Sequence, residues 1–102
     1  MAGIMIERSD GPAGGRYSSR HDGRESEMTY TRTCRDKQEL MVIDHTLVPE
    51  ELAGRGVGLA LMRRAVEDAR AEGLKILPVC SFARVMLARH DDLRDVIADG
   101  SV

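Results

Sequence analysis

A glycine-rich turn between an apolar run and an amphipathic helix constrains this chain more than any other feature. The apolar run, Leu40–Val48, ends at Pro49. Just before the helix, glycines occupy alternate positions: Gly54, Gly56 and Gly58. The first N–H groups of a helix have no partner within it, and the helix dipole adds partial positive charge there. Backbone bared by glycine at such a place accepts phosphate, so the pattern predicts a phosphate-bearing cofactor. A plain tight turn is the alternative.

Two better-known phosphate-binding loops do not fit this turn. The P-loop needs a Lys-Ser/Thr pair after its last glycine, where this chain has Leu59 and Ala60. The dinucleotide fingerprint follows the first strand of a βαβ unit. Here the turn lies in mid-chain, after several predicted antiparallel strands. A cofactor other than a nucleoside triphosphate or a dinucleotide is therefore expected.

Composition narrows the class of protein. With 102 residues, 42% apolar and 31% charged, the sequence is typical of a single globular domain over residues 1–102. A net charge of −2 and the lack of a basic patch argue against nucleic-acid binding. No apolar run is long enough to span a membrane, and no signal-peptide core is seen. Cys34 and Cys80 lack metal-ligand spacing, so free thiols, no metal and a cytoplasmic location are expected.

The N-terminal part reads as antiparallel strands. A short strand is predicted within Gly3–Arg8, and Ser9–Gly15 has the composition of a loop. Asp22-Gly23 is a strong hairpin signal, and it predicts that the two flanking segments pair: Arg16–His21 and Arg24–Arg32.

A crossover follows these strands. The polar turn Cys34–Lys37 leads into Glu39–Val48, which is apolar on both sides and is expected to be a central strand covered on both faces. Apolar periodicity predicts a helix over Val57–Glu72, with Gly73 as its C-cap. Lys75–Val79 reads as a strand parallel to the central one.

The C-terminal part reads as helical. Ser81 is expected to cap a helix over Phe82–Arg89, and Asp91–Ile97 is expected to form a further helical turn. Ala98–Val102 reads as a frayed tail.

This order of elements resembles the GNAT superfamily of acetyl-CoA-dependent N-acetyltransferases. Their signature, Gln/Arg-x-x-Gly-x-Gly/Ala, matches Ala53–Gly58 at both glycines and departs from it at Ala53. A subfamily of very small GNAT-like proteins is more similar still, through Asp44-His45-Thr46, Leu77–Ala83 and Arg89-His90. The resemblance covers roughly Glu27 to Ile97.

The resemblance implies a mixed α/β (α+β) fold: a reduced GNAT-like acyl-CoA N-acyltransferase fold, with antiparallel strands, a β-α-β crossover and a C-terminal helix. It implies acetyl-CoA as cofactor. The backbone of Leu47 and Val48 would pair with the pantetheine arm, and an amide near Leu47 would polarise the thioester carbonyl. The pyrophosphate would be held by the amides of five residues: Arg55, Gly56, Val57, Gly58 and Leu59.

His45 and Cys80 are the candidate catalytic residues. They stand near the cofactor ends of the two parallel strands, so their side chains could approach each other beside the thioester. A histidine with its ordinary pKa of about 6.5 takes a proton from an amine or a thiol. Cysteine accepts an acyl group or protonates a leaving thiolate. The alternative for both is a structural role, since cysteine is often buried and strand histidines often satisfy backbone groups.

Many GNAT enzymes protonate the departing thiolate with a tyrosine of the last helix, where this chain has Leu87. Tyr17 and Tyr30 read as core or sheet-face residues. The leading function is N-acetyltransfer to an amine, with a protein or peptide amine among the acceptors considered, because the elements that usually shape the acceptor pocket are missing. The alternative is an acyl-CoA-binding module with little or no turnover. A monomer or weak dimer is expected.

Overall fold

In the computed structural model, which describes residues 4–98, the strands form one sheet in the order β1-β2-β3-β4-β5. Their bounds are β1 Glu7–Asp10, β2 Gly14–His21, β3 Arg24–Arg35, β4 Gln38–Leu47 and β5 Lys75–Pro78. Strands β1 to β4 pair antiparallel, and β5 pairs parallel with β4. The predicted α+β fold class, with its parallel crossover, is confirmed.

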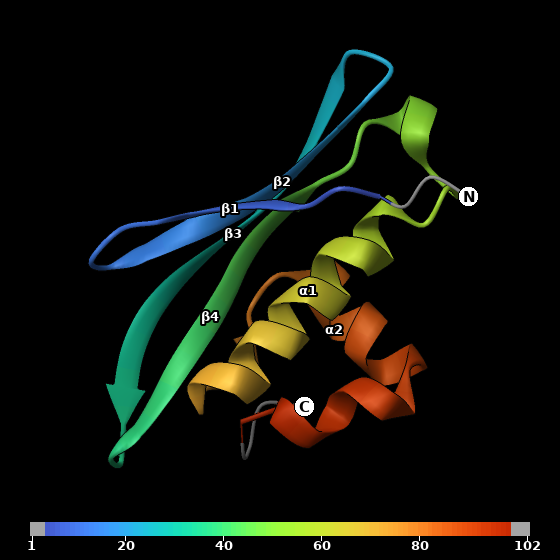
Figure 1. The fold of residues 1–102 in the computed structure, drawn as a ribbon. Helices are drawn as coiled ribbons and strands as arrows, with labels where there is room; N and C mark the ends of the chain where they lie inside the picture. The colour runs from blue at the N-terminus through green and yellow to red at the C-terminus, as the bar shows by residue number, and fades with distance from the viewer. Residues whose placement is uncertain (1–3, 99–102) are drawn as a thin grey trace.

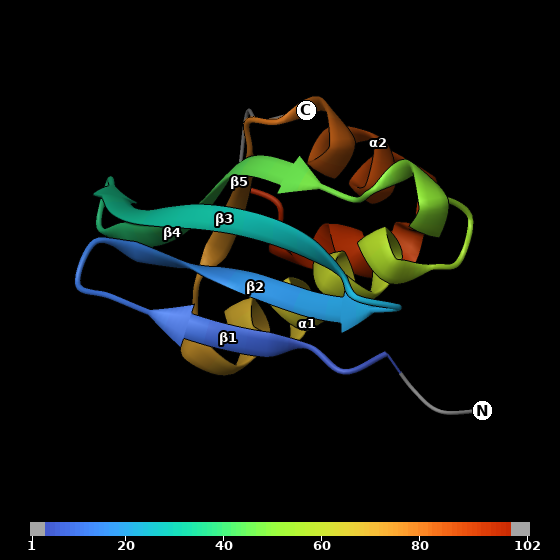
Figure 2. The same ribbon diagram turned by 90° about the horizontal axis from the view of Figure 1, so that it is seen from above.

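All helices of the described chain pack on one face of this sheet, as Figures 1 and 2 show from two directions. They are the 3₁₀ helix η1 (Glu50–Leu52), α1 (Val57–Glu72), α2 (Ser81–Arg89) and the 3₁₀ helix η2 (Asp91–Val96). The expectation that β4 is covered on both faces is therefore wrong. Met41 and Ile43 are fully buried in the core on the helical side, whereas Leu40 and Val42, which alternate with them, are not part of that core cluster. None of these helices has the length and apolar character that crossing a bilayer requires.

The β2–β3 hairpin and helix α1 follow the sequence closely. Asp22 and Gly23 both adopt left-handed backbone conformations, φ 51° and 75°, as the predicted hairpin turn requires. Helix α1 covers the predicted residues and ends at Gly73, whose φ of 71° and N–H bond to the Ala69 carbonyl make it the C-cap. Its apolar stripe, fully or almost fully buried, includes Leu61 and Val66.

Both ends of the chain differ from expectation. Strand β1 overlaps the predicted strand at Glu7 and Arg8 and extends into the supposed loop, because Glu7–Asp10 pairs with β2 in antiparallel register. The loop shrinks to three residues between these strands. Ala98, placed in a frayed tail by the sequence, is buried and donates its N–H to the Ile76 carbonyl at 2.8 Å. The remainder of that predicted tail, and the first three residues of the chain, lie outside the described residues.

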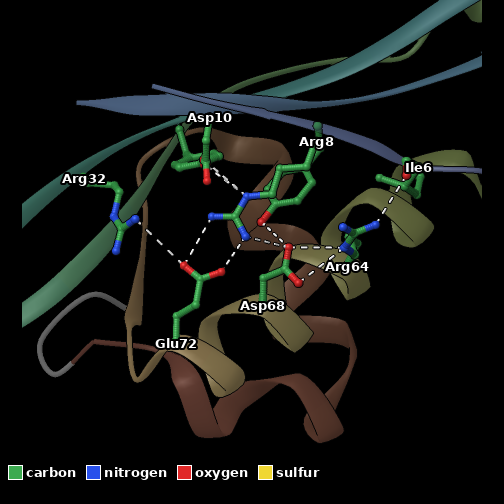
Figure 3. A network of polar contacts seen from close by, with 9 residues as sticks. Ile6, Arg8, Asp10, Arg32, Arg64, Asp68 and Glu72 are labelled. Carbon is green, nitrogen blue, oxygen red and sulfur yellow. Dashed lines mark hydrogen bonds and ion pairs between the residues drawn. The ribbon is translucent and has the colours of Figure 1, made fainter. Parts of the chain in front are cut away.

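Arg8 fastens β1 to α1 (Figure 3). Its side chain is only 13% exposed and forms ion pairs with Asp68, at 3.0 Å, and with Glu72. The guanidinium carbon lies 5.5 Å from the ring centroids of both Tyr17 and Tyr30, within range of a cation–π interaction. The Tyr17 hydroxyl donates to Asp68 at 2.9 Å. A buried cation thus joins two tyrosines of the sheet to two carboxylates of the helix.

Candidate active site

Strands β4 and β5 separate at one end, which creates the opening around which the site is built. Their register ends at the pair Ile43 and Pro78. The N–H groups of Val79 and Cys80 then both donate to the Ile43 carbonyl, at 3.0 and 3.2 Å, and the chain turns into α2. Strand β4 continues to Leu47 without β5 beside it. Its edge therefore offers backbone groups to an added partner.

A β-bulge in β4 lies at the same place. Thr29 of β3 opposes His45, whereas the next residue of β3, Tyr30, opposes Ile43. Asp44 is therefore an extra residue in β4. Such a bulge interrupts the alternation of side chains and increases the local twist. The pattern of apolar residues in the sequence gave no signal of it.

The glycine-rich turn supplies an uncapped helix start. Gly54 and Gly56 have φ values of 80° and 83°, a conformation that glycine adopts without strain. Gly56 is the N-cap of α1, and no side chain accepts a hydrogen bond from the first turn. Leu52, which is 1% exposed, anchors the preceding η1 turn in the core. The first N–H groups of α1 are thus held in place and presented to a ligand.

An apolar groove of about 310 Å³ runs beside this helix start. The turn residues Gly54, Gly56 and Gly58 form one wall. Apolar side chains form the rest, among them Val48, Leu59, Phe82 and Met86. Backbone N–H donors next to an apolar groove suit a ligand that has a phosphate group joined to a long, weakly polar arm.

The backbone of Arg55 is part of the glycine-rich turn, but its side chain reaches to the tip of the β2–β3 hairpin. Its Nη1 lies 3.0 Å from Oδ2 of Asp22, in the tip of the β2–β3 hairpin. Arg24 of the same hairpin pairs with Glu51 of η1 at 3.3 Å. Both pairs are exposed and so contribute little to stability. They place the hairpin tip against the glycine-rich turn.

Cys80 caps α2 at the opening. Its Sγ accepts the N–H of Ala83 at 3.4 Å, so the predicted cap at Ser81 is wrong, and the helix begins one residue earlier than expected. The same sulfur lies 3.5 Å from Oγ1 of Thr46 in β4. Thr46 was not among the predicted site residues. Its position next to His45 in a strand could have indicated that one of the two faces the helices.

His45 and Cys80 do not meet. The side chain of Thr46, not His45, reaches Cys80 across the opening. The imidazole of His45 is 57% exposed, and its Nε2 lies 3.9 Å from Oε2 of Glu27. Because successive strand residues point to opposite faces, His45 lies on the face without helices. The expected approach of the two side chains is therefore not found.

Neither tyrosine lies at the opening. Both are buried beneath α1, where burial and the hydrogen bond to Asp68 raise the pKa of the Tyr17 phenol. Leu87 of α2 is fully buried in the core. The sequence prediction that both tyrosines are core or sheet-face residues is therefore confirmed.

Comparisons with known proteins agree with this geometry. A family model described as GCN5-related N-acetyl-transferase matches residues 16–96. A GCN5-like candidate N-acetyltransferase from Staphylococcus aureus, solved by NMR, is 34% identical, with a TM-score of 0.71 over 96% of this chain and 91% of that one. An aminoglycoside acetyltransferase from an uncultured soil sample shares the fold, with 14% identity and a TM-score of 0.62 over 81% of this chain and 59% of that chain. No curated protein matches the chain.

Proposed function

Because the chain belongs to the GCN5-related N-acetyltransferase family, we propose that it transfers an acetyl group from acetyl-CoA to an amine. The observation that carries the proposal is the opening between β4 and β5, beside the uncapped start of α1. Acetyl-CoA supplies the activated acetyl thioester. The chain's own part is to hold that molecule and to bring an amine to it.

The cofactor site comprises the turn and the free edge of β4. Amides of Arg55, Gly56, Val57, Gly58 and Leu59 would hold the pyrophosphate at the helix start. The apolar groove beside them, of about 310 Å³, would take part of the pantetheine arm. The backbone of Leu47 and Val48, beyond the last pair with β5, would bind that arm as an added strand.

Cys80 and His45 would act from the two sides of β4. Cys80 stands at the start of α2, where a helix N-terminus favours negative charge on sulfur. It would protonate the departing thiolate, with acyl acceptance and plain packing as the alternatives. His45 would take the proton of the amine on the exposed face.

The exposed face favours an amine that projects from a larger molecule. Within residues 4–98 no helix covers this face (Figure 2). Both His45 and Asp44 are exposed to solvent. A lysine side chain or a chain terminus of a protein or peptide can reach such a surface without entering a pocket. We place the reaction in the cytoplasm, where the two free thiols would stay reduced.

A matched pair of glycine variants tests the cofactor site. Gly56 and Gly73 have similar left-handed φ values, 83° and 71°, and a β-carbon at either meets no atom within 4 Å. Gly56→Val and Gly73→Val should therefore lose similar stability. Only Gly56→Val should weaken acetyl-CoA binding, by at least tenfold, in calorimetry. Equal affinities for the two variants would place the cofactor elsewhere.

Turnover is tested next, by release of free thiol from acetyl-CoA in the presence of lysine peptides. The burial of Leu87, in the helix where many relatives have a tyrosine acid, favours a second candidate function. This is an acyl-CoA-binding module with little turnover. Tight acetyl-CoA binding without thiol release for any amine of a broad panel would support that module over the enzyme.

A further inference from the structure

The bulge in β4 brings a carboxylate and an imidazole to the same face. Asp44 and His45 both oppose Thr29 across the β3–β4 pair, and both are exposed. The hydroxyl of Thr29 donates a hydrogen bond to Oδ1 of Asp44 at 2.6 Å. This bond holds the carboxylate on the face of β3 that also carries Glu27. Without the extra residue, neighbouring positions would point to opposite faces.

Among the described residues, Asp44 is a carboxylate without a cation. Its hydrogen bond comes from a neutral hydroxyl, and no Lys, Arg or His lies within ion-pair distance. Glu27, nearby on the same face, differs, because Arg16 lies 2.8 Å from its Oε1 and His45 lies near its other oxygen. Of these two carboxylates, Asp44 is therefore the one whose charge is free to pair with a bound cation.

Two exposed apolar side chains lie at the opening where β4 and β5 separate, near the bulge that carries this carboxylate. Leu47 is 51% exposed and Val79 is 50% exposed, and they flank the contact between Thr46 and Cys80 on the two sides of the opening. Most exposed positions in β4 and around β5 are polar or short, so two large apolar groups at this opening are notable. A flexible hydrocarbon chain is the group they would contact most favourably.

We propose that Asp44 binds the ammonium group of an alkylamine acceptor, and that Leu47 and Val79 contact its hydrocarbon chain. The inference rests on the proposed function and assigns the residues of this chain that would hold the acceptor: a carboxylate for its charged end and two apolar side chains for its hydrocarbon chain. An uncharged aromatic amine would gain nothing from the carboxylate.

The proton balance follows from this arrangement. The bound ammonium gives one proton to the adjacent His45, which passes it to solvent. The freed nitrogen lone pair forms a bond with the acetyl carbon while the carbon–sulfur bond breaks. The departing thiolate takes a proton from Cys80, and the second proton of the nitrogen then restores the Cys80 thiol. The products are the N-acetylated amine, coenzyme A with a free thiol and one proton in solution.

NMR titration tests the ammonium site without relying on catalysis. The probe is N-acetyl-lysine amide, and its matched control is N-acetyl-norleucine amide, which keeps the hydrocarbon chain and lacks the charge. In the wild-type protein, the lysine probe should shift the amide signals of Asp44, His45, Leu47 and Val79. It should bind at least tenfold more tightly than the norleucine probe.

Asp44→Asn should weaken the lysine probe about tenfold and leave the norleucine probe unchanged. Asp36→Asn, at the far turn of the β3–β4 hairpin, is the matched control and should change neither. Equal binding of both probes, no shift near Asp44, or unchanged binding by Asp44→Asn would overturn the inference. If the lysine probe binds as expected and no acetyl group is ever transferred, the acceptor site stands and the proposed enzyme activity fails.

Discussion

The ring of Phe82 lies against Gly58 so closely that a β-carbon at position 58 would overlap the ring tip. The absence of a side chain at Gly58 therefore has a packing reason, whereas the glycine at position 56 serves a left-handed backbone. The alternating glycines of the turn thus have different causes. This contact joins the start of α1 to α2, beside the groove proposed for acetyl-CoA.

Gly58→Ala should change stability by less than about 1 kcal/mol, because the gain in helix propensity offsets the displacement of the ring. The displaced ring would move within the groove, so acetyl-CoA affinity should fall several-fold. Urea unfolding and calorimetry measure the two effects. The double variant Gly58→Ala/Phe82→Leu should regain affinity; if it does not, the ring is not the cause.

Cys80 should react with a thiol probe faster than Cys34, although Cys34 is the more exposed of the two. The reason is the helix start at Cys80, which favours developing negative charge on sulfur. Acetyl-CoA should protect Cys80 and leave Cys34 unprotected. Cys80→Ser should bind the cofactor normally and lose most transfer activity, whereas Cys34→Ser should keep both. Full activity of Cys80→Ser would mean that the Cys80 side chain has only a packing role.

Arg8→Met should lower the free energy of unfolding by about 2 kcal/mol, since it leaves two partly buried carboxylates with weaker pairing: Asp68 keeps Arg64, and Glu72 keeps only the more distant Arg32. The loss should be smaller than for a fully buried pair, because Glu72 keeps contact with water. Arg20→Met, at an exposed site with one contact at 3.9 Å, should change little. Similar losses in the two variants, measured by urea unfolding, would mean that Arg8 is not the main link between β1 and α1.

Stability should fall as pH rises above about 10, the ordinary pKa of tyrosine. Burial, and then the bond to Asp68, raise the pKa of Tyr17 in the folded state. Above pH 10 the unfolded chain loses this proton while the folded chain keeps it, so the contribution is complete below pH 10 and lost above. Tyr17→Phe should show a shallower decline between pH 9 and 11 in urea unfolding. A slope equal to that of the wild type would exclude Tyr17 as its source.

Lys37→Gly should stabilise the protein by about 1 kcal/mol, because Lys37 has a left-handed φ of 69° that costs a residue with a side chain roughly this much. The neighbouring Asp36 shares the conformation, with φ 54°. Gly23→Lys in the other hairpin is the reverse substitution and should destabilise by a similar amount. Thermal unfolding of both variants measures the two changes in stability. The prediction requires that Lys37→Gly raises the melting temperature and that Gly23→Lys lowers it.

The elements that the sequence predicted well are those set by local rules. The Asp22-Gly23 turn, helix α1 and its C-cap at Gly73 each depend on residues adjacent in the chain. The family resemblance, carried by the motifs around the glycine-rich turn and Cys80, is likewise confirmed by the family match. Short motifs and periodicity were sufficient for these conclusions.

What was missed depends on how one strand pairs with another. Strand β1 is defined by its hydrogen bonds to β2, and its own residues, Glu-Arg-Ser-Asp, favour a loop. The bulge at Asp44 exists only relative to β3, so the sides of β4 on which His45 and Thr46 lie could not be read from their order. One inserted residue thus separated the two predicted catalytic side chains.

The chain has two tyrosines and no tryptophan, and both tyrosine rings stack around Arg8 between the sheet and α1. Near-ultraviolet absorption and circular dichroism of this protein therefore come almost wholly from one junction. A spectroscopist who follows these signals during refolding observes the docking of the helix onto the sheet. The glycine-rich turn and the cofactor opening contain no tyrosine or tryptophan. Changes there are therefore not reported by these signals unless a bound ligand contributes a chromophore.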